Sequence, residues 1–464
     1  MEFDLPAETI NAVENRPFWY SERILFIVSL LVFVFFACLL YITEAGNTAI
    51  AHKGFLDYLF NSVSVGTLTG LFRDDSGNYT FAGQVVLMFD MLVSAVIASA
   101  IASLLLLFVR YGFVPGHSVR SELGRMGLTS RRVILFILLD LAFMWLVGTT
   151  LVLISGSSSL WEAIFNALSH ILNDGVTALP GNMVIYKNNP SMLLSGILLI
   201  TLGGWGIGIR GFAYQYIFKI LGFKRLARSI PDHLLIPFRF SMVIIGVTVF
   251  LQVVGALSLY NFEAFNKALP PTEHWSMLQS YYMSVSARTA GFTISPDLSL
   301  LSDKSHFILI ALMFIGAASG SFAGGVLKLT AFVYLFVYII SKFRGDPEVR
   351  TPGAFIHMSR RTAIEANFRL IGFSFLTFVT TILIFFEQPG ASGWWLLFEA
   401  ISAVSNTGLT LGATNDLTQL SMTSVMFLMI MGKIGFIATT VSFFPKLQHL
   451  LERYPEEHDQ VAVD

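Results

Sequence analysis

The chain has 464 residues, of which 55% are hydrophobic and only 13% are charged, and its mean hydropathy is +0.69. A soluble domain carries about 25% charged residues, so this composition excludes an ordinary soluble protein and indicates a membrane protein. The formal net charge is −1, so no excess of positive charge suggests a nucleic-acid partner.

The N-terminal 21 residues are polar and acidic, and we predict that segment 1–21 is cytoplasmic. The apolar run that follows, residues 22–43, is too long for the core of a signal peptide and has the length of a membrane helix. It contains Cys38, the single cysteine of the chain, which excludes an intramolecular disulfide. We interpret Cys38 as a residue packed in the core.

Residues 60–70 are the first copy of a repeated pattern. The segment FNSVSVGTLTG begins with an aromatic residue and ends at Gly70. The same spacing recurs in FNALSHILNDG, YYMSVSARTAG and FEAISAVSNTG, which end at Gly175, Gly291 and Gly408. The copies lie about 110 residues apart, and a near-constant period indicates repeated structural units.

Each copy lies in a unit with the same order of segments: a long apolar run, a short segment ending in the glycine pattern, and a second long apolar run. The short segments cannot span a bilayer, so we predict re-entrant helices that enter the membrane and turn back. The segments are 22–43, 55–65 and 81–110 in the first unit, 133–154, 160–171 and 192–221 in the second, 235–259, 275–287 and 306–341 in the third, and 368–387, 394–404 and 422–451 in the fourth.

Lys and Arg cluster in the stretches between the units, whereas the linker SGSSSLW has none. The positive-inside rule therefore places these stretches and both termini in the cytoplasm. The predicted fold class is an all-α polytopic membrane protein with about eight transmembrane helices. Four helix–re-entrant pore loop–helix repeats, residues 22–110, 133–221, 235–341 and 366–451, surround a central pore, and residues 452–464 form a cytoplasmic tail.

The glycine pattern suggests a cation site. Glycine permits backbone angles that aim carbonyl oxygens at one point, and threonine hydroxyls add oxygen ligands. Four such loops around an axis can replace the water shell of a cation. The alternative is that the small residues only allow close helix packing, but the fourfold recurrence favours the pore.

Two other classes of function compete with a pore. An ion-coupled secondary transporter with alternating access usually has inverted repeats, whereas these units share one orientation; it remains the alternative function. A membrane enzyme is not predicted, because the chain has no recognisable nucleophile elbow, metal motif or nucleotide loop.

Stretches from three of the repeats resemble the TrkH/TrkG/KtrB potassium-uptake superfamily. SARTAGFTI followed by MFIGAASGSFAGGVLK resembles its third repeat, and LFEAISAVSNTGLTLG followed by IMGKIGFIATT resembles its fourth. LITLGGWGIGI is similar to the pore-lining helix of its second repeat. The resemblance covers about residues 23–451 and is closest to KtrB-like subunits, because no extra helical pair precedes the first repeat.

This resemblance implies a potassium-translocating subunit of a Trk/Ktr-type uptake system in the bacterial cytoplasmic membrane. It implies a homodimer with one pore per subunit and a cytoplasmic ring of RCK-type regulatory subunits. Nucleotide is expected on that ring, and this chain is expected to hold no cofactor apart from the transported K⁺. The implied selectivity filter consists of Thr67, Leu68, Thr69, Gly70, Asn173, Asp174, Gly175, Thr289, Ala290, Gly291, Asn406, Thr407 and Gly408.

The resemblance also implies a gate. Segment 316–325 interrupts the last helix of the third repeat, and in the family this segment is an intramembrane loop that obstructs the pore below the filter. Lys433 stands where the family usually has arginine and is expected to bind loop carbonyls. Alternatively, Lys433 extends to the cytoplasmic side or pairs with Asp90 or Asp140. The predicted gate residues are Gly316, Ser319, Gly320, Ser321, Gly324, Gly325 and Lys433.

Three carboxylates are further candidates. Asp90 and Asp140 lie within predicted spans, where a carboxylate is a functional candidate by default; the alternative is a buried pair, for example with Arg210 or Lys433. Asp174 stands where the family usually has a small neutral residue. We expect it at the outer mouth of the filter, where it would concentrate cations; the alternative is that it caps its own loop.

Overall fold

The computed structural model describes residues 19–111, 127–225, 230, 238–264, 266, 274–318, 320–344, 360–388 and 392–434. Within these residues the regular structure is helical, with one isolated β-bridge between Ile315 and Leu327. Residues 1–18 of the predicted N-terminal segment and the predicted tail 452–464 lie outside the described residues.

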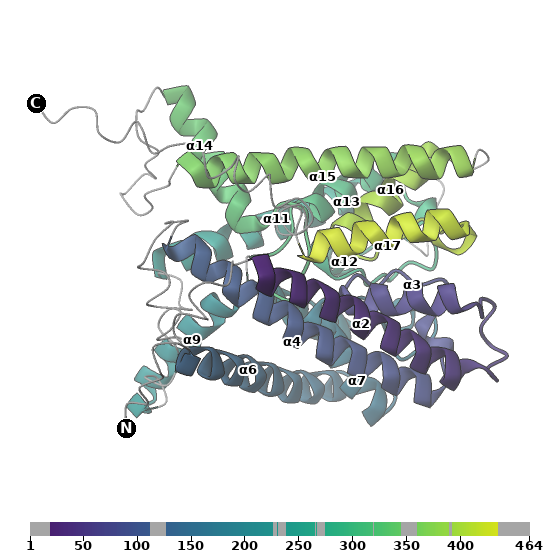
Figure 1. Ribbon diagram of the computed structural model, residues 1–464, viewed down its shortest axis with the longest axis horizontal. Coiled ribbons are helices and arrows are strands. Elements are labelled where there is room, and N and C mark those ends of the chain that lie inside the picture. Colours follow the sequence, from purple (N-terminus) through teal and green to yellow (C-terminus); the bar gives the residue numbers. More distant parts are fainter. Residues whose placement is uncertain are drawn as a thin grey trace, which may run out of the picture.

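Each predicted repeat contains a long helix, a short helix and a second long segment (Figure 1). Repeat 1 contains α2 (Trp19–Glu44), α3 (Phe55–Gly66) and α4 (Phe81–Tyr111). Repeat 2 contains α6 (Gly127–Ile154), α7 (Leu160–Leu172), α8 (Pro190–Gly204) and α9 (Ile207–Ile220). Repeat 3 contains α11 (Phe238–Glu263), α12 (Met277–Thr289), α13 (Asp303–Phe314) and α14 (Leu329–Arg344). Repeat 4 contains α15 (Arg360–Glu387), α16 (Gly393–Val404) and α17 (Gln419–Ile434).

Short 3₁₀ turns lie in the connections, namely η1 (Ser76–Asn78), η2 (Val184–Tyr186), η5 (Leu298–Leu300) and η6 (Ala413–Asp416). Several helix boundaries differ from the sequence prediction. The helix α2 includes residues 19–21 of the predicted N-terminal segment, and α6 and α15 begin at Gly127 and Arg360, earlier than expected. The predicted continuation of the last helix over 435–451 lies outside the described residues.

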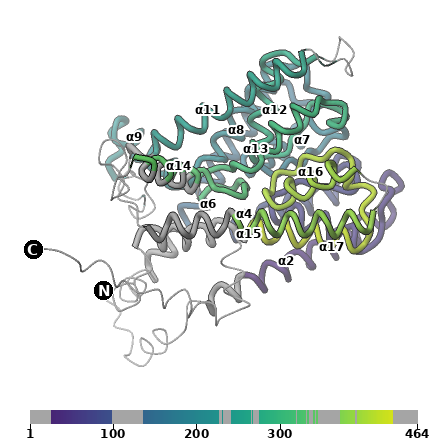
Figure 2. The backbone as a smooth tube through the Cα atoms, turned by 90° about the horizontal axis from the view of Figure 1, so that it is seen from above, coloured from purple at the N-terminus to yellow at the C-terminus, as the bar shows by residue number. Residues whose placement is uncertain are grey.

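The four repeats close into a ring. The second long segment of each repeat contacts the short helix of the next repeat, in the pairs α4–α7, α8–α12, α13–α16 and α17–α3. Viewed from above, α11, α12 and α13 lie on one side, and α15, α16 and α17 lie on the other (Figure 2). Each short helix thus packs against helices of its own repeat and of the preceding repeat in the ring.

The helix lengths agree with a membrane location. In the described residues, three apolar stretches are long enough to cross a bilayer: Phe26–Glu44, Leu135–Ile154 and Ser241–Glu263. The short helices α3, α7, α12 and α16 have only 12 or 13 residues and cannot span it. Cys38 is exposed among apolar side chains of α2, so its interpretation as a core residue was wrong.

In three of the repeats, a glutamate links the end of the first long helix to the start of the second long segment. Glu44, Glu263 and Glu387 are the last residues of α2, α11 and α15, and each binds the N-terminus of the second long segment of its repeat. Their carboxylates satisfy donors that a helix start leaves free, and they lie at the positive end of its dipole. The hydrogen bonds include those from Thr80 N to Glu44 (3.1 Å), from Ser302 N to Glu263 (3.1 Å) and from Ser421 Oγ to Glu387 (3.3 Å).

The second long segments of repeats 2 and 3 are both broken. In repeat 2, the continuous run expected over 192–221 is wrong, because α8 and α9 meet at a bend of 104°. Arg210 satisfies backbone groups that the break releases, donating from Nη1 to the carbonyl of Leu202 at 3.2 Å and also to the carbonyl of Trp205. In repeat 3, residues 315–328 separate α13 from α14, so the predicted interruption is confirmed.

Candidate functional site

The four glycines that end the repeated pattern share one backbone conformation. Their φ angles are +84° at Gly70, +78° at Gly175, +71° at Gly291 and +91° at Gly408. L-residues rarely adopt this left-handed region, whereas glycine enters it at little cost. The glycines therefore make equivalent turns in all four repeats.

These turns meet in a closed ring. A Cβ atom added to Gly70 would lie within 3.0 Å of the carbonyl oxygen of Asp174. The same relation joins Gly175 to Ala290, Gly291 to Thr407, and Gly408 to Thr69. Each glycine thus faces the carbonyl that precedes the glycine of the next repeat. The structure brings the four predicted filter loops, residues 67–70, 173–175, 289–291 and 406–408, into contact around one axis.

The residue two positions before the glycine also shapes three of the loops. Leu68, Asn173 and Asn406 have φ angles of +53°, +59° and +51°. Asparagine tolerates this region through its short polar side chain, whereas leucine does not; Leu68 is fully buried, and packing holds it there. In repeat 3 the helix α12 continues to Thr289 instead, and Gly291 N donates to the carbonyl of Ser286 at 3.2 Å.

Side chains tie neighbouring filter loops together. Asn406 Nδ2 donates to Thr69 Oγ1 at 2.9 Å, which links repeats 4 and 1. Thr289 Oγ1 donates to Asn173 Oδ1 at 2.9 Å, which links repeats 3 and 2. Thr67 Oγ1 donates to the carbonyl of Val63 at 2.7 Å. The threonine hydroxyls thus make protein hydrogen bonds, and the backbone carbonyls are the oxygens that the ring geometry brings together.

A second set of positioning residues, which the sequence did not predict, directly follows the first aromatic residue of the repeated pattern. Asn61 Oδ1 accepts from Arg73 N at 3.2 Å, and Asn166 Oδ1 accepts from Ala178 N at 3.1 Å. Glu399 occupies the same position in repeat 4 and accepts from Thr414 Oγ1 at 2.9 Å. These side chains hold the segment that leaves the predicted filter loop in repeats 1, 2 and 4. The sequence contained one sign of these residues: in three of the four copies of the glycine pattern, a polar residue directly follows the first aromatic residue.

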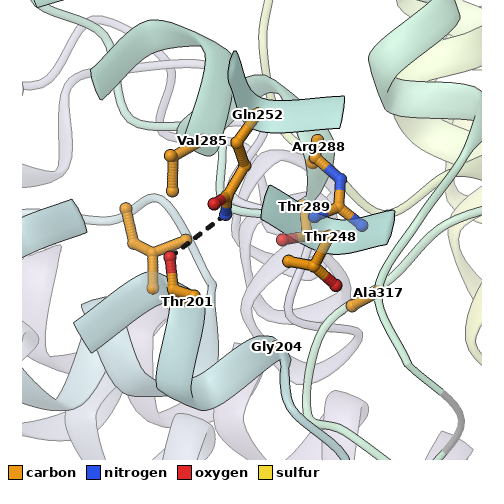
Figure 3. Close-up of a pocket in the computed structure, with 9 residues that line it drawn as sticks. Thr201, Gly204, Thr248, Gln252, Val285, Arg288, Thr289 and Ala317 are labelled. Atoms are coloured by element: carbon orange, nitrogen blue, oxygen red, sulfur yellow. Dashed lines mark hydrogen bonds between the residues drawn. The ribbon is translucent and has the colours of Figure 1, made fainter. Parts of the chain in front are cut away.

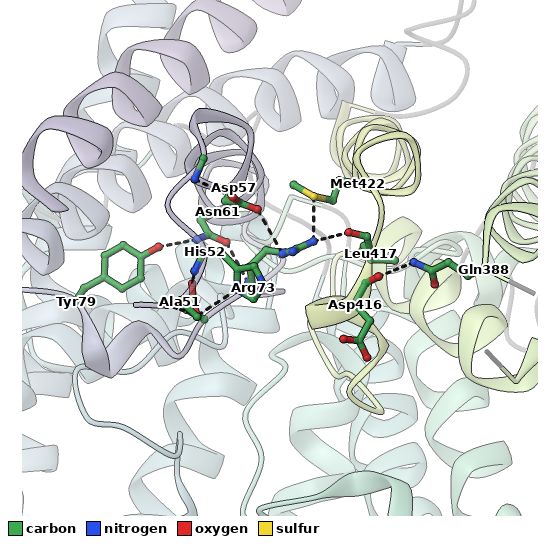
Figure 4. Close-up of polar contacts among 12 residues, drawn as sticks. Ala51, His52, Asp57, Asn61, Arg73, Tyr79, Gln388, Asp416, Leu417 and Met422 are labelled. Carbon is green, nitrogen blue, oxygen red and sulfur yellow. Dashed lines mark hydrogen bonds and ion pairs between the residues drawn. The ribbon is translucent and has the colours of Figure 1, made fainter. Parts of the chain in front are cut away.

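A buried arginine joins repeat 1 to repeat 4 just beyond the first filter loop (Figure 4). Arg73 Nη1 donates to the carbonyl of Leu417 at 2.6 Å, and Arg73 Nε lies 3.4 Å from the carboxylate of Asp57. Nearby, Tyr79 accepts a hydrogen bond from Asn61 Nδ2 at 2.6 Å. Burial raises the pKa of the Tyr79 hydroxyl above its ordinary value.

Asp174 differs from both expectations for it. Its side chain is fully buried rather than exposed at an outer mouth. Neither carboxylate oxygen has a hydrogen-bond partner among the described residues, so Asp174 does not cap its own loop. The charged groups with which it interacts electrostatically are Lys433 and Asp90. Asp174 is thus a buried carboxyl group directly before a ring glycine, without a hydrogen-bond partner among the described residues.

The other two intramembrane carboxylates have protein partners. Asp140 forms an ion pair with Arg210 at 2.7 Å, which confirms the structural alternative for this residue. Asp90 accepts hydrogen bonds from Ser62 Oγ (2.8 Å) and Ser94 Oγ (3.2 Å), and not from Arg210 or Lys433. Among the described residues, no group of three or more His, Cys, Asp or Glu side chains could hold a metal ion.

The break in repeat 3, residues 315–328, is named here the intramembrane loop. It contacts the fourth filter loop directly, because Gly325 N donates to the carbonyl of Ser405 at 2.5 Å. Lys433 Nζ donates to the carbonyl of Phe322 at 2.7 Å, so the expected contact between Lys433 and the loop is confirmed and its two alternatives are not. Predicted gate residue Ser319 lies outside the described residues.

Two further cations hold the ends of this loop. Arg288 Nη2 donates to the carbonyl of Gly316 at 2.8 Å, and Lys328 Nζ donates to the carbonyl of Gly324 at 3.0 Å. A break at membrane depth leaves carbonyls without helical partners, which a buried donor can satisfy. The three cations therefore stabilise the non-helical backbone of the loop.

The loop also lies against the break in repeat 2. Ile207 N donates to the carbonyl of Gly320 at 3.0 Å, and Ala318 N donates to the carbonyl of Gly204 at 3.2 Å. The guanidinium of Arg210 lies 5.1 Å from the centre of the Phe322 ring, within the range of a cation–π contact. Residues of repeat 2 and residues of repeat 4 thus both bind the intramembrane loop.

Comparison with known proteins agrees with this architecture. The chain matches the TrkH family, described as a cation transport protein, over residues 128–450. It is 27% identical over 416 residues to the Ktr system potassium uptake protein B of Bacillus subtilis (strain 168). This alignment covers 86% of this chain and 88% of the relative. It is also 28% identical over 308 residues to the potassium/sodium uptake protein NtpJ of Enterococcus hirae. That alignment covers 65% of this chain and 64% of the relative.

A solved structure has the same fold. The crystal structure of the potassium transporter TrkH from Vibrio parahaemolyticus is similar with a TM-score of 0.66. The similarity covers 90% of this chain and 85% of that one, at 15% sequence identity. The arrangement of helices described above is thus shared with a protein of low sequence identity.

Proposed function

We propose, from the premise that this chain belongs to the TrkH family of cation transport proteins, that it is the potassium-translocating membrane subunit of a Trk/Ktr-type uptake system. The observation that carries the proposal is the ring of four left-handed glycines, each against the carbonyl that precedes the next glycine. Backbone carbonyls in such a ring can replace the water shell of a cation. The names of the relatives support potassium as the ion, and one of them includes sodium.

In this mechanism the ion loses water at the filter loops and then meets the intramembrane loop. The loop contacts the filter through Gly325 and Ser405, and Lys433 and Arg210 hold Phe322 next to this contact. Movement of the loop away from the filter would open the path to the cytoplasm. We propose that a cytoplasmic ring of RCK-type subunits, which bind nucleotide, drives this movement and that the chain forms a homodimer in the bacterial cytoplasmic membrane, with both termini cytoplasmic.

A secondary transporter with alternating access is the second candidate. Its repeats are usually inverted, whereas the glycine contacts run in one direction around the ring, from repeat 1 through 2, 3 and 4 back to 1. This rotational relation favours a single central pore. A catalytic role is not part of the proposal.

Ion flux from the purified chain in liposomes tests the proposal. We expect potassium and rubidium to enter faster than sodium, because a ring of carbonyls of fixed spacing discriminates between cations by coordination number and field strength. Slow, saturable flux would favour the transporter instead. If liposomes that contain the folded chain take up none of the three ions, both candidates are contradicted.

Asp174→Asn is expected to lower cation flux several-fold and to lower sodium flux more than potassium flux. A carboxylate is a stronger-field ligand than a carbonyl, so its loss weakens the binding of the smaller ion more. Because Asp174 is fully buried, bulk salt screens it weakly and the loss should be similar at low and high ionic strength.

Flux of both ions at two salt concentrations checks this prediction. Asp303→Asn is the control for loss of one negative charge, since Asp303 is exposed at the start of α13. A loss seen only at low salt would instead support a role at the outer mouth.

A further inference from the structure

A small pocket lies between α8, α11 and α12, beside the start of the intramembrane loop (Figure 3). Polar side chains from three segments meet there. Its lining includes Thr201, Thr248, Gln252, Arg288, Thr289 and Ala317. One side of the pocket thus touches the third filter loop, through Thr289, and another touches the intramembrane loop.

The guanidinium of Arg288 lines this pocket with little compensation for its charge. Only 4% of the residue is exposed. Its hydrogen bond to the carbonyl of Gly316 is the one that it makes among the described residues, and its Nε atom has no partner. A guanidinium has five N–H donors and does not lose its charge in proteins. The dipole at the C-terminus of α12 supplies only about half an opposite charge.

The other buried arginines provide an internal comparison. In the described part of the chain, Arg73 and Arg210 are also buried, and each is within ion-pair distance of an aspartate. Arg288 has no such carboxylate there. A charge inside the membrane is costly without a partner, so the site around Arg288 favours a bound group of opposite charge.

Around the pocket, the polar groups of Gln252 and Thr201 that have no hydrogen-bond partner among the described residues are donors. Gln252 Nε2 donates to Thr201 Oγ1 at 3.1 Å, and its carbonyl oxygen already accepts from Tyr281 at 3.3 Å. One amide N–H of Gln252 and the O–H of Thr201 have no acceptor among the described residues. Thr248 uses its own O–H on the carbonyl of Ile244 at 2.8 Å. Free donors and one cation are suited to an anion.

We infer that this pocket binds one small monovalent anion of the size of chloride. The guanidinium of Arg288, the hydroxyl of Thr201 and the amide of Gln252 are its ligands. The anion neutralises Arg288 next to Thr289 of the filter and so reduces the repulsion that a cation in the filter experiences. Its effect on flux rests on the proposed function, whereas binding of the anion does not.

Bromide serves as the probe. Crystals of the full chain grown with bromide should show an anomalous peak in the pocket. The purified protein should melt at a higher temperature in bromide or chloride than in gluconate, because a ligand of the folded state stabilises it. Thr201→Val keeps the side-chain shape and removes the donor, so bromide affinity, measured from this melting shift, should fall about tenfold. Thr150→Val, in a lipid-facing position, is the matched control.

Rubidium flux in liposomes gives the second readout. It should fall several-fold when gluconate replaces chloride on both sides. A water peak alone in the pocket, with melting temperatures that do not depend on the anion, would overturn the inference. Absence of cation flux in every anion would contradict the proposed function instead, and the bromide peak would still decide the anion site.

Discussion

Serine in place of Gly291 is expected to reduce the preference for potassium over sodium by about tenfold or more. At φ +71° a side chain is strained, and the added Cβ would lie within 3.0 Å of the carbonyl oxygen of Thr407. Backbone strain of this kind costs about 1–3 kcal/mol, and every 1.4 kcal/mol is a factor of ten in relative affinity. The loop must shift to accept serine, which turns carbonyls at the contact between repeats 3 and 4.

The measurement is the ratio of potassium to sodium uptake in liposomes, at matched amounts of folded protein. Gly246→Ser is the control, because Gly246 lies on an exposed face of α11 in the same repeat, and a Cβ there would meet nothing within 4 Å. A Gly291→Ser protein that folds and retains the parent ratio would exclude Gly291 from the filter.

Lys433→Met is expected to raise basal cation flux about tenfold and to make it less dependent on the regulatory ring. Methionine keeps much of the side-chain length but removes the donor that holds the carbonyl of Phe322 at 2.7 Å. A hydrogen bond to a charged group contributes about 1.5–3 kcal/mol, and 1.4 kcal/mol shifts an equilibrium tenfold. Loss of the lysine also removes a positive charge from the path of the cation.

Flux with and without the regulatory partner decides this prediction. Lys219→Met is the matched control, since Lys219 is an exposed lysine near the end of α9 and its side chain is bonded only to Gln215 among the described contacts. Deletion within residues 317–323 should raise flux in the same way. If both variants reach the membrane and conduct no faster than the parent in either condition, the intramembrane loop is not the gate.

Much of the site followed from patterns that are local in the chain. The turn glycines were identified because each needs a left-handed φ, a requirement of its own backbone that sequence spacing reveals. The break in repeat 3 followed from the glycine content of 316–325, whereas Lys433 was expected as a donor to this segment from the family resemblance. The break in repeat 2 was missed, because Arg210, which satisfies its free carbonyls, reaches them only after the chain bends.

The partners of charged residues inside the membrane could not be predicted from the sequence. The sequence left alternatives open for Asp90, Asp140 and Lys433, because pairing inside a membrane depends on which helices are neighbours. The fold pairs Asp140 with Arg210, gives Asp90 two serines and leaves Asp174 with no partner among the described residues.

The sequence by itself determined that this protein is a membrane protein of four repeats, with a glycine turn in each. Composition and period require no knowledge of distant contacts. Only the tertiary structure decided how the turns face one another: Gly70 against Asp174, and Gly408 against Thr69. The same holds for the uncompensated charge of Arg288. The physical reason is that the free energy of a buried charge or carbonyl depends on neighbours that the chain brings together only when the ring closes.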